Sequence, residues 1–598
     1  MSDQAIATPP MTLEERAQRA IRISERAARV LKAMLERDPG DRFSIPDPEV
    51  VGQAFGELGK ALMQDPDRLM QAQMQLWLDH GRLWNAQFMK LFGGPAVEVA
   101  EPEPGDRRFR DDAWTEGPAY DWLKQSYLVN ARWLKSLAAD TPGLDPKTRA
   151  KVEFYTRQMV DACSPTNFVM TNPAALAHAA ETGGESLLDG LEHLLDDMER
   201  ARGEFTPSMT PRSAFRIGED IATTPGEVVF RNDLMELIQY APSTPTVAQA
   251  PLLIVPPWIN KFYILDLKPK NSFIRWAVSQ GQTVFLVSWV NPDASLAGKT
   301  FEDYLREGPL AAMDVIERQT GERVMNVIGY CLGGTLTSCL LAHLAASGQA
   351  ERIRSATLFA CLTDFADPGE VGVFIDEDQI ARLEKHMEQK GYLEADYMAR
   401  VFAMLRANDL IWGFAVNNYL MGREPMAFDL LYWNSDGTRM PRMMHAFYLR
   451  EMYLRNRLIE PGALTLLGSP IDLGRIELPM FFLSTREDHI APWKSTYAGS
   501  RRFGGPVEFV LAGSGHIAGV INPAESSKYG YWTGKADMDD PEAWLAAAEN
   551  HPGSWWPHWR EWLRAFEGEQ VAARNPADGP MPPLCPAPGE YVLVQARD

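Results

Sequence analysis

The chain has 598 residues, of which 45% are hydrophobic and 23% are charged, and its formal net charge is −21. This length exceeds what one hydrophobic core usually holds, so we expect at least two domains. The excess of negative charge argues against nucleic acid as the main partner and is typical of a soluble protein.

The sequence contains neither a membrane-spanning segment nor a secretory signal that we can identify. The longest apolar run, PLLIVPPWI at residues 251–259, is shorter than the roughly 20 residues that cross a bilayer, and two adjacent prolines interrupt it. The first 20 residues lack the order of basic and then apolar residues that a signal peptide has. We therefore expect the protein to stay in the cytosol.

Residues 1 to about 210 predict an all-helical N-terminal domain. Apolar residues recur there at helical intervals and strand-like alternation is absent. The clearest helical stretches are 12–38, 66–94, 119–140 and 186–201. An acidic, proline-bearing linker, PAVEVAEPEPGD, separates the second from the third. Two roles remain open: a domain that only packs, or aromatic-rich helices that bind a partner or a hydrophobic surface.

From about residue 211 the pattern changes to a catalytic α/β domain. Short strands in GEVVFRNDLMELIQYAP are followed by apolar strands that alternate with helices. The predicted strands are 251–258, 282–289, 324–330 and 353–362, and the predicted helices between them are 272–281 and 300–321. Strands that are apolar throughout are typical of a parallel sheet covered on both faces.

An insertion from about residue 364 to 460 interrupts this alternation. It is rich in Met, Phe, Tyr and Trp, and we interpret it as a largely helical cap that moves as a lid and keeps water from the site. For any single residue, ordinary core packing is an equal alternative. The sheet pattern resumes in LPMFFLSTRED and VEFVLAGSGH, and the tail that begins near residue 521 contains GSWWPHWREWL.

GYCLGG, residues 329–334, has the outline of a nucleophile elbow in an α/β-hydrolase fold, with Cys331 as the nucleophile. The turn is tight, and Gly329 and Gly333 supply small residues on either side. The helix that follows directs its positive end at the sulfur and favours the thiolate. The backbone N–H of Leu332 is left to bind an oxyanion. A small buried cysteine is the alternative.

The other cysteines are scattered and form no CxxC pair. We interpret them as packing or surface residues; they are Cys163, Cys339, Cys361 and Cys585. We expect no disulfide framework, no metal site and no cofactor.

The acid and the base should follow the nucleophile along the chain. Asp488 lies at the end of one later predicted strand, LPMFFLSTRED. His516 follows the next, VEFVLAGSGH, in a loop able to bring the imidazole over the sheet. Asp364, after the strand that follows the nucleophile, is a rival for the acid. Glu487 should point the other way on an extended strand, and His489 is a residue that shapes the site.

A second oxyanion donor should come from the loop INKFYILDL, which follows PLLIVPPW. Its backbone N–H belongs to Ile259 or to Asn260, and the sequence does not choose between them. We interpret Lys261 in the same loop as a surface charge only.

With these residues in place, the chain closely resembles the poly(3-hydroxyalkanoate) synthases of class I, over about residues 105 to 595. The matching stretches are VPPWINKFYILDL, SWVNPD, GYCLGGTL, STREDHIAPW, GSGHIAGVINP, GSWWPHW, DRRFRDDAW, SPTNFVMTNP and TPGEVVFRNDLMELIQY. Cys331, Asp488 and His516 fall on the catalytic positions of that family. Val290 departs mildly, because the position is often basic in relatives.

The resemblance implies an enzyme that polymerises 3-hydroxyacyl-CoA, by default the short 3-hydroxybutyryl-CoA, and releases CoA. Attack by Cys331 exchanges one thioester for another, so the acyl group stays activated, whereas a serine ester would be more stable. His516 would take the thiol proton. Asp488 would orient His516 or help to deprotonate the 3-hydroxyl, and whether one thiol or two carry the chain is open.

The same resemblance implies that the N-terminal domain supports a homodimer and holds the enzyme on polyester granules in the cytoplasm. Two other classes remain as alternatives. A thioesterase or polyester depolymerase of the same fold would share the triad, but serine would be expected, and a secreted depolymerase would carry a signal peptide. A non-catalytic granule coat protein would be short and would need no elbow.

Overall fold

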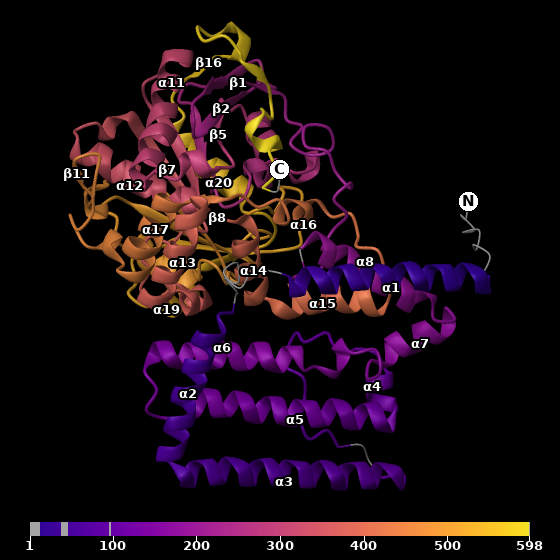
Figure 1. Cartoon of the computed structure of the whole chain (residues 1–598). Coiled ribbons are helices and arrows are strands. Elements are labelled where there is room, and N and C mark those ends of the chain that lie inside the picture. Colours follow the sequence, from indigo (N-terminus) through magenta and orange to yellow (C-terminus); the bar gives the residue numbers. More distant parts are fainter. Residues whose placement is uncertain (1–11, 37–45, 95–96, 202, 597–598) are drawn as a thin grey trace. The chain divides into compact units, whose positions relative to one another are not determined.

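The structure, a computed structural model, describes residues 12–36, 46–94, 97–201 and 203–596 (Figure 1). It divides into two compact units. The helical unit takes in the described part of residues 1–211 together with Arg406–Met426, and the α/β unit comprises Arg212–Leu405 and the described residues from Ala427 onward. The segment 406–426, which the sequence placed in the cap, therefore packs with the N-terminal helices.

Eight α-helices precede residue 211 in the described part of the helical unit. They are α1 (Leu13–Leu35), α2 (Pro48–Gln64), α3 (Pro66–Leu91), α4 (Ala113–Glu116), α5 (Pro118–Asp140), α6 (Pro146–Ala162), α7 (Pro173–Glu181) and α8 (Glu185–Arg200). The four predicted helices correspond to α1, α3, α5 and α8. The first two residues of the predicted linker lie outside the described residues, and 97–106 form neither helix nor strand.

Local chemistry explains where several of these helices begin. Asp47, Asp65 and Asp145 accept hydrogen bonds from backbone N–H groups of the first turns of α2, α3 and α6, and a proline follows each of them. Within the unit, α3 packs on α5, α5 on α6, and α1 on α8. Helix α8 also packs on η10 (Val416–Leu420), where a Cβ on Gly190 would lie only 1.9 Å from the carbonyl oxygen of Tyr419.

The α/β unit is built on one mixed sheet of eleven strands in the order β15-β14-β13-β12-β7-β6-β4-β5-β2-β1-β17. Neighbours from β13 to β5 pair in parallel, and the strands outside them pair antiparallel. The predicted parallel sheet is therefore confirmed for the centre only. The architecture is that of an α/β hydrolase.

The strands of this sheet have the following bounds: β1 (Gly226–Arg231), β2 (Met235–Tyr240), β4 (Leu252–Val255), β5 (Val284–Trp289), β6 (Met325–Tyr330), β7 (Ile353–Phe359), β12 (Met480–Thr485), β13 (Val507–Ala512), β14 (Tyr531–Lys535), β15 (Glu549–His551) and β17 (Cys585–Pro586). Central strands β4, β5, β6 and β12 are buried at every residue. This burial on both faces explains their continuous apolar sequences.

Helices cover the sheet. They include α9 (Phe273–Ser279), α10 (Phe301–Leu305), α11 (Ala311–Thr320), α12 (Leu332–Ala346), α18 (Trp493–Ser500), α19 (Pro541–Ala547) and α20 (Trp556–Leu563). The single helix predicted at 300–321 is wrong, because a π-helical turn, Arg306–Leu310, divides it into α10 and α11. Gly308 there has the non-helical angles φ −91° and ψ −107°, and Pro309 has no N–H to donate.

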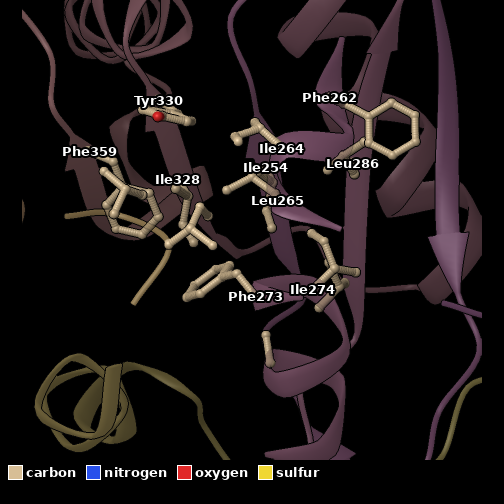
Figure 2. Close-up of a cluster of buried hydrophobic side chains, with 14 of the residues drawn as sticks. Ile254, Phe262, Ile264, Leu265, Phe273, Ile274, Leu286, Ile328, Tyr330 and Phe359 are labelled. Atoms are coloured by element: carbon tan, nitrogen blue, oxygen red, sulfur yellow. The ribbon is translucent and has the colours of Figure 1, made fainter. Parts of the chain in front are cut away.

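Apolar side chains from strands and helices meet in the core shown in Figure 2. Ile254 of β4, Ile328 of β6 and Phe359 of β7 are fully buried there, and Phe273 of α9 packs against them. The ring of Trp559 in α20 lies 5.3 Å from that of Phe273, centroid to centroid. This core fixes the carboxyl end of β6, which carries the elbow.

The insertion after β7 is largely helical, as predicted. Its elements in the α/β unit are η8 (Gly369–Phe374), α13 (Glu377–Lys390), β8 (Tyr392–Leu393), α14 (Ala395–Leu405), α16 (Asp429–Asn434), β9 (Met440–Pro441), α17 (Arg442–Phe447) and the π-helix η11 (Tyr448–Leu454). Within the described residues, no helix has the length and apolar character needed to cross a bilayer.

Candidate active site

Cys331 occupies the turn between β6 and α12 in a strained backbone conformation, with φ 52° and ψ −120°. A non-glycine residue at positive φ persists only where its surroundings hold it. Here the N–H of Cys331 donates to the carbonyl of Phe359 at 2.9 Å, and its own carbonyl accepts from the N–H groups of Gly334 and Thr335 at 2.9 and 3.2 Å. The structure thus places Cys331 in a tight turn between a strand and a helix, and its role as a nucleophile stays a prediction.

The two elbow glycines lie where no side chain fits. A Cβ on Gly333 would come within 2.1 Å of the carbonyl oxygen of Val255, and one on Gly329 would come within 2.6 Å of the Cα of Gly334. The close approach at Gly333 also shows that the end of β4 lies directly against the start of α12.

Leu332 is the first residue of α12 and lies next to the sulfur-bearing residue. The first N–H groups of a helix have no carbonyl partner within the helix and carry partial positive charge. The backbone N–H of Leu332 therefore lies at the start of α12 beside Cys331, and its role as an oxyanion donor stays a prediction.

The structure brings the predicted base and acid together. His516, in the loop after β13, is 4% exposed, and its Nδ1 lies 2.7 Å from Oδ2 of Asp488. The other oxygen of Asp488 accepts from the N–H groups of Ile490 and Ala491, each at 2.8 Å, and Oδ2 also accepts from the Thr485 hydroxyl at 3.1 Å. The carboxylate is thus held in one orientation against the imidazole.

Charges around His516 change its protonation. Burial lowers its pKa, but the charges of Asp488 and Cys331, and hydrogen bonding with both side chains, outweigh burial and raise the pKa to about 10. The thiol and the carboxylate therefore act on the same imidazole. This arrangement favours a charged imidazolium beside the sulfur, which is the state a thiolate nucleophile requires.

Two groups that the sequence analysis missed hold the His516 loop. The hydroxyl of Tyr330 donates to the backbone carbonyl of His516 at 3.2 Å, and the two rings stack with centroids 5.8 Å apart. The indole N–H groups of Trp555 and Trp556 donate to the carbonyls of Gly519 and Val520 at 2.9 and 3.0 Å. The tryptophans of GSWWPHW were a signal that could have been used, because a buried indole needs an acceptor.

Asp364, the rival acid, is engaged elsewhere. Its carboxylate accepts from Asn456 Nδ2 at 2.8 Å and from the backbone N–H of Ala366 at 3.0 Å, and it forms an ion pair with Arg502 at 3.2 Å. Glu487, by contrast, is exposed. Of the three candidate carboxylates, Asp488 is the one that contacts His516 in the structure.

The predicted second donor lies in the segment 256–263, which we call the oxyanion loop. Ile259 and Asn260 are both half-buried in it. The interpretation of Lys261 as a surface charge is wrong: its side chain is 2% exposed, and its Nζ lies 2.9 Å from Oδ1 of Asp436 in the cap. A lysine is buried here because it has a carboxylate partner that lies far away in the sequence.

Three aromatic residues of the insertion gather near the nucleophile. The ring of Phe365 lies 4.8 Å from that of Tyr453 and 6.0 Å from that of Tyr448, and the two tyrosine rings are 5.5 Å apart. Burial raises the pKa of both tyrosines, and the charge of Cys331 raises each further. The π-helix η11 places residues five apart on one face, which an α-helical pattern did not predict.

The remaining cysteines lie in other surroundings. Burial raises the pKa of Cys339 to about 12 and that of Cys361 well above its usual value. Cys163 is exposed and Cys585 half-buried. Among the described side chains, no group of three or more His, Cys, Asp or Glu is placed to hold a metal ion.

Known proteins similar to this chain cover both units. A family model described as the N-terminus of poly-beta-hydroxybutyrate polymerase (PhaC) matches residues 105–277, and one described as the alpha/beta hydrolase fold matches residues 253–523. A poly(3-hydroxyalkanoate) polymerase of Methylorubrum extorquens is 50% identical over 535 residues, which are 89% of this chain and 88% of that protein.

Two further relatives carry the name poly(3-hydroxyalkanoate) polymerase subunit PhaC. The protein of Rhizobium meliloti (strain 1021) is 48% identical over 556 residues, which are 93% of this chain and 90% of the relative. That of Cupriavidus necator is 43% identical over 537 residues, which are 89% of each chain.

Proposed function

The chain belongs to the poly(3-hydroxyalkanoate) polymerase family and is an acyltransferase-type enzyme, and we propose that Cys331, His516 and Asp488 are its catalytic residues. The observation that carries this proposal is the 2.7 Å contact between His516 and Asp488, on an imidazole whose pKa the elbow cysteine also raises. The acyl carrier is then the Cys331 thiol, and the substrate is a 3-hydroxyacyl-CoA.

In the first step His516 holds the proton of Cys331, and the thiolate attacks the thioester carbonyl of the substrate. A bond forms between Sγ and the carbonyl carbon, the bond from that carbon to the CoA sulfur breaks, and CoA leaves with the proton from the imidazolium. One thioester replaces another, so the step is nearly balanced in free energy and the acyl group stays activated.

Negative charge develops on the carbonyl oxygen during this attack. The backbone N–H of Leu332 binds it from the start of α12, and the N–H of Ile259 in the oxyanion loop binds it from the other side. The proximity of the two segments supports this pairing, since Gly333 lies against the carbonyl of Val255 at the end of β4.

In the elongation step the 3-hydroxyl of an acyl unit attacks the next thioester carbonyl. An ester bond forms, the bond from that carbon to sulfur breaks, and the sulfur leaves as a thiol. His516 takes the hydroxyl proton and passes it to that sulfur. Asp488 orients His516 in this step rather than acting on the hydroxyl, because both of its oxygens already accept hydrogen bonds from neighbouring groups.

The cap keeps water from the acyl thioester. Phe365, Tyr448 and Tyr453 pack against one another with large, mostly apolar side chains, and the charge of Cys331 acts on both tyrosines. Exclusion of water favours transfer to a hydroxyl over hydrolysis. The crowding of these rings also supports short acyl units, such as 3-hydroxybutyryl, as the preferred substrate.

The helical unit attaches the enzyme to its polyester product and supports a homodimer. Helix α3 exposes a set of large apolar residues, which are Met70, Met74, Trp77, Leu78, Trp84, Phe88, Met89 and Leu91. Exposed apolar surface of this extent is typical of a surface that binds another apolar surface.

One assay separates the proposed function from its alternatives. Purified protein is mixed with 3-hydroxybutyryl-CoA, and free CoA and turbidity are followed together. Release of CoA with turbidity supports polymerisation, whereas release of CoA with soluble hydroxy acid would show a thioesterase. The Cys331→Ala variant should lose CoA release by roughly a thousandfold or more. A substantial residual rate in this variant would place the nucleophile elsewhere.

A further inference from the structure

A second segment of the cap lies alongside the oxyanion loop. Residues 433–438, at the end of α16 and just after it, form what we call the clamp segment, and a β-bridge joins Gly437 to Asn260. Thr438 is 3% exposed and Trp433 is 4% exposed, so the contact between the two segments is buried.

The clamp segment binds three carbonyls of the loop backbone. The Trp433 indole N–H donates to the carbonyl of Lys261 at 2.7 Å, and the N–H of Thr438 donates to the carbonyl of Ile259 at 3.2 Å. The Thr438 hydroxyl donates to the carbonyl of Trp258. Loop carbonyls thus point toward the cap at each of these positions.

Fixing these carbonyls also fixes the direction of the loop N–H groups. In a trans peptide the C=O and the N–H of the following residue point to opposite sides of the chain. With the carbonyl of Trp258 turned to Thr438, the N–H of Ile259 points away from the cap segment, and the bond to the carbonyl of Ile259 does the same for the N–H of Asn260. Both candidate oxyanion donors are therefore oriented by Thr438.

A buried ion pair reinforces the same contact. Lys261 Nζ and Asp436 Oδ1 lie 2.9 Å apart, with side chains 2% and 13% exposed. The Tyr263 hydroxyl donates to Oδ2 of Asp436 at 2.9 Å. Burial and the charge of Asp436 raise the pKa of Tyr263, so its hydroxyl keeps the proton that it donates. A buried ion pair is a costly way to gain stability, but it fixes geometry.

We propose that Thr438 and the Lys261–Asp436 pair are positioning residues that orient the backbone N–H groups of the oxyanion loop toward the reacting carbonyl. The position of the clamp segment then determines whether these N–H groups can bind the oxyanion. The inference rests on the proposed function, because it requires a thioester at Cys331. These residues act through the loop backbone and not by contact with the substrate.

The test is a pair of substitutions at Thr438, assayed by CoA release from 3-hydroxybutyryl-CoA. Thr438→Val keeps the volume but removes the hydroxyl, and kcat should fall about tenfold while KM changes less than about twofold. Thr438→Ser restores the hydroxyl and should recover most of kcat. Ser435→Ala is the control, because that exposed hydroxyl, just after α16, donates to the carbonyl of Leu431 in the same helix and not to the oxyanion loop.

A structural role alone would give a different result. The Thr438→Val variant would then melt at a lower temperature, yet its kcat per folded molecule would equal that of the wild type and the serine variant. This outcome would overturn the proposal for Thr438.

The ion pair is tested with both charges removed, because Lys261→Met alone would leave a buried, unpaired carboxylate that strongly destabilises the fold. The double variant Lys261→Met with Asp436→Leu should fold and bind substrate with an unchanged KM, but with a lowered kcat. A folded double variant with the kcat of the wild type would overturn the role of the pair. Cys331→Ala is assayed in parallel: if it still releases CoA, the proposed function fails, whatever the clamp variants show.

Discussion

At the scale of single residues, Cys331 stands out because its backbone is held in a strained conformation with positive φ. The positive φ directs its sulfur out of the turn between β6 and α12, where the helix N-terminus and the imidazole of His516 act on it. In the proposed mechanism, sulfur suits the acyl carrier because a thioester remains reactive toward a hydroxyl.

The two candidate acids give a matched pair of substitutions. Asp488→Asn should keep the shape of the site but lose the charge that holds the His516 imidazolium, and we expect CoA release in steady state to fall by roughly a thousandfold. Asp364→Asn should change kcat less than about threefold, because Asp364 bonds to Asn456 and pairs with Arg502 instead.

Rates of CoA release and polymer mass, measured for both variants, decide between them. Wild-type chain growth in the Asp488→Asn variant, together with a loss in Asp364→Asn, would reverse the assignment. A single-turnover measurement would also show whether Cys331 is still acylated once without the carboxylate.

The raised pKa of His516 predicts a pH dependence of stability. The folded pKa is about 10, whereas the ordinary value is 6.5, so the favourable charge on the imidazolium contributes fully below about pH 6.5 and is lost as the pH rises through about 10. The melting temperature of the wild type should therefore fall over this window by more than that of Asp488→Asn. Parallel melting curves of the two proteins at pH 6, 8 and 10 would contradict this prediction.

Local sequence predicted some of these residues and missed others for a physical reason. Cys331 and His516 follow strands at the edge where catalytic groups collect, and that placement is visible in apolar runs and glycines. Lys261 was misread because its partner, Asp436, lies in a separate segment of the chain. Tyr448 and Tyr453 were missed because a π-helical turn changes which residues share a face.

At the scale of elements, close backbone approach determines where glycine is required. Gly333→Ala would place its Cβ 2.1 Å from the carbonyl oxygen of Val255, so α12 or the end of β4 must move. We expect a loss of about 1–3 kcal/mol in stability and a larger loss of CoA release, since Leu332 and the oxyanion loop would separate.

Gly298→Ala is the matched control for this variant, because no atom outside its immediate neighbours lies within 4 Å of the added Cβ. Melting temperature and CoA release are measured on both. If Gly333→Ala behaved like Gly298→Ala, the close contact between the two segments would not matter for the reaction.

The break at Gly308 shows the limit of element prediction from periodicity. Apolar spacing continues from α10 into α11, so the pattern predicted one helix at 300–321. The structure breaks at Gly308, and only glycine fits there because an added Cβ would lie 2.4 Å from the ring of Trp289. Such a contact between distant segments leaves no trace in local spacing, whereas the alternation of apolar strands and helices did indicate the sheet.

At the scale of the whole molecule, the described chain forms two compact units. The α/β unit contains the proposed triad, the oxyanion loop and the clamp segment. The helical unit includes residues 406–426, which leave the cap sequence and pack on α8 through the contact at Gly190. The sequence pattern placed the change from helical to mixed structure near residue 210. It did not assign residues 406–426 to the helical unit, because their apolar spacing is compatible with either unit.

The proposed attachment to polyester predicts that apolar residues of α3 anchor the enzyme. Trp77 is 71% exposed and Met74 is 59% exposed, so substitution of both by Gln should cost little in folding. Burial of two such side chains against a polymer surface would contribute roughly 3 kcal/mol or more, so the variant should partition to granules at least tenfold less.

Sedimentation of enzyme with preformed granules measures this fraction. Met170→Gln is the control, because Met170 is 78% exposed in the same unit but lies outside α3. Size-exclusion chromatography of the same proteins separates the two proposed roles of the helical unit. Loss of granule binding with an unchanged oligomer identifies α3 as the polymer-binding surface, whereas loss of a dimer would show that a second copy of the chain covers this helix. Wild-type granule binding with a wild-type oligomer would contradict both.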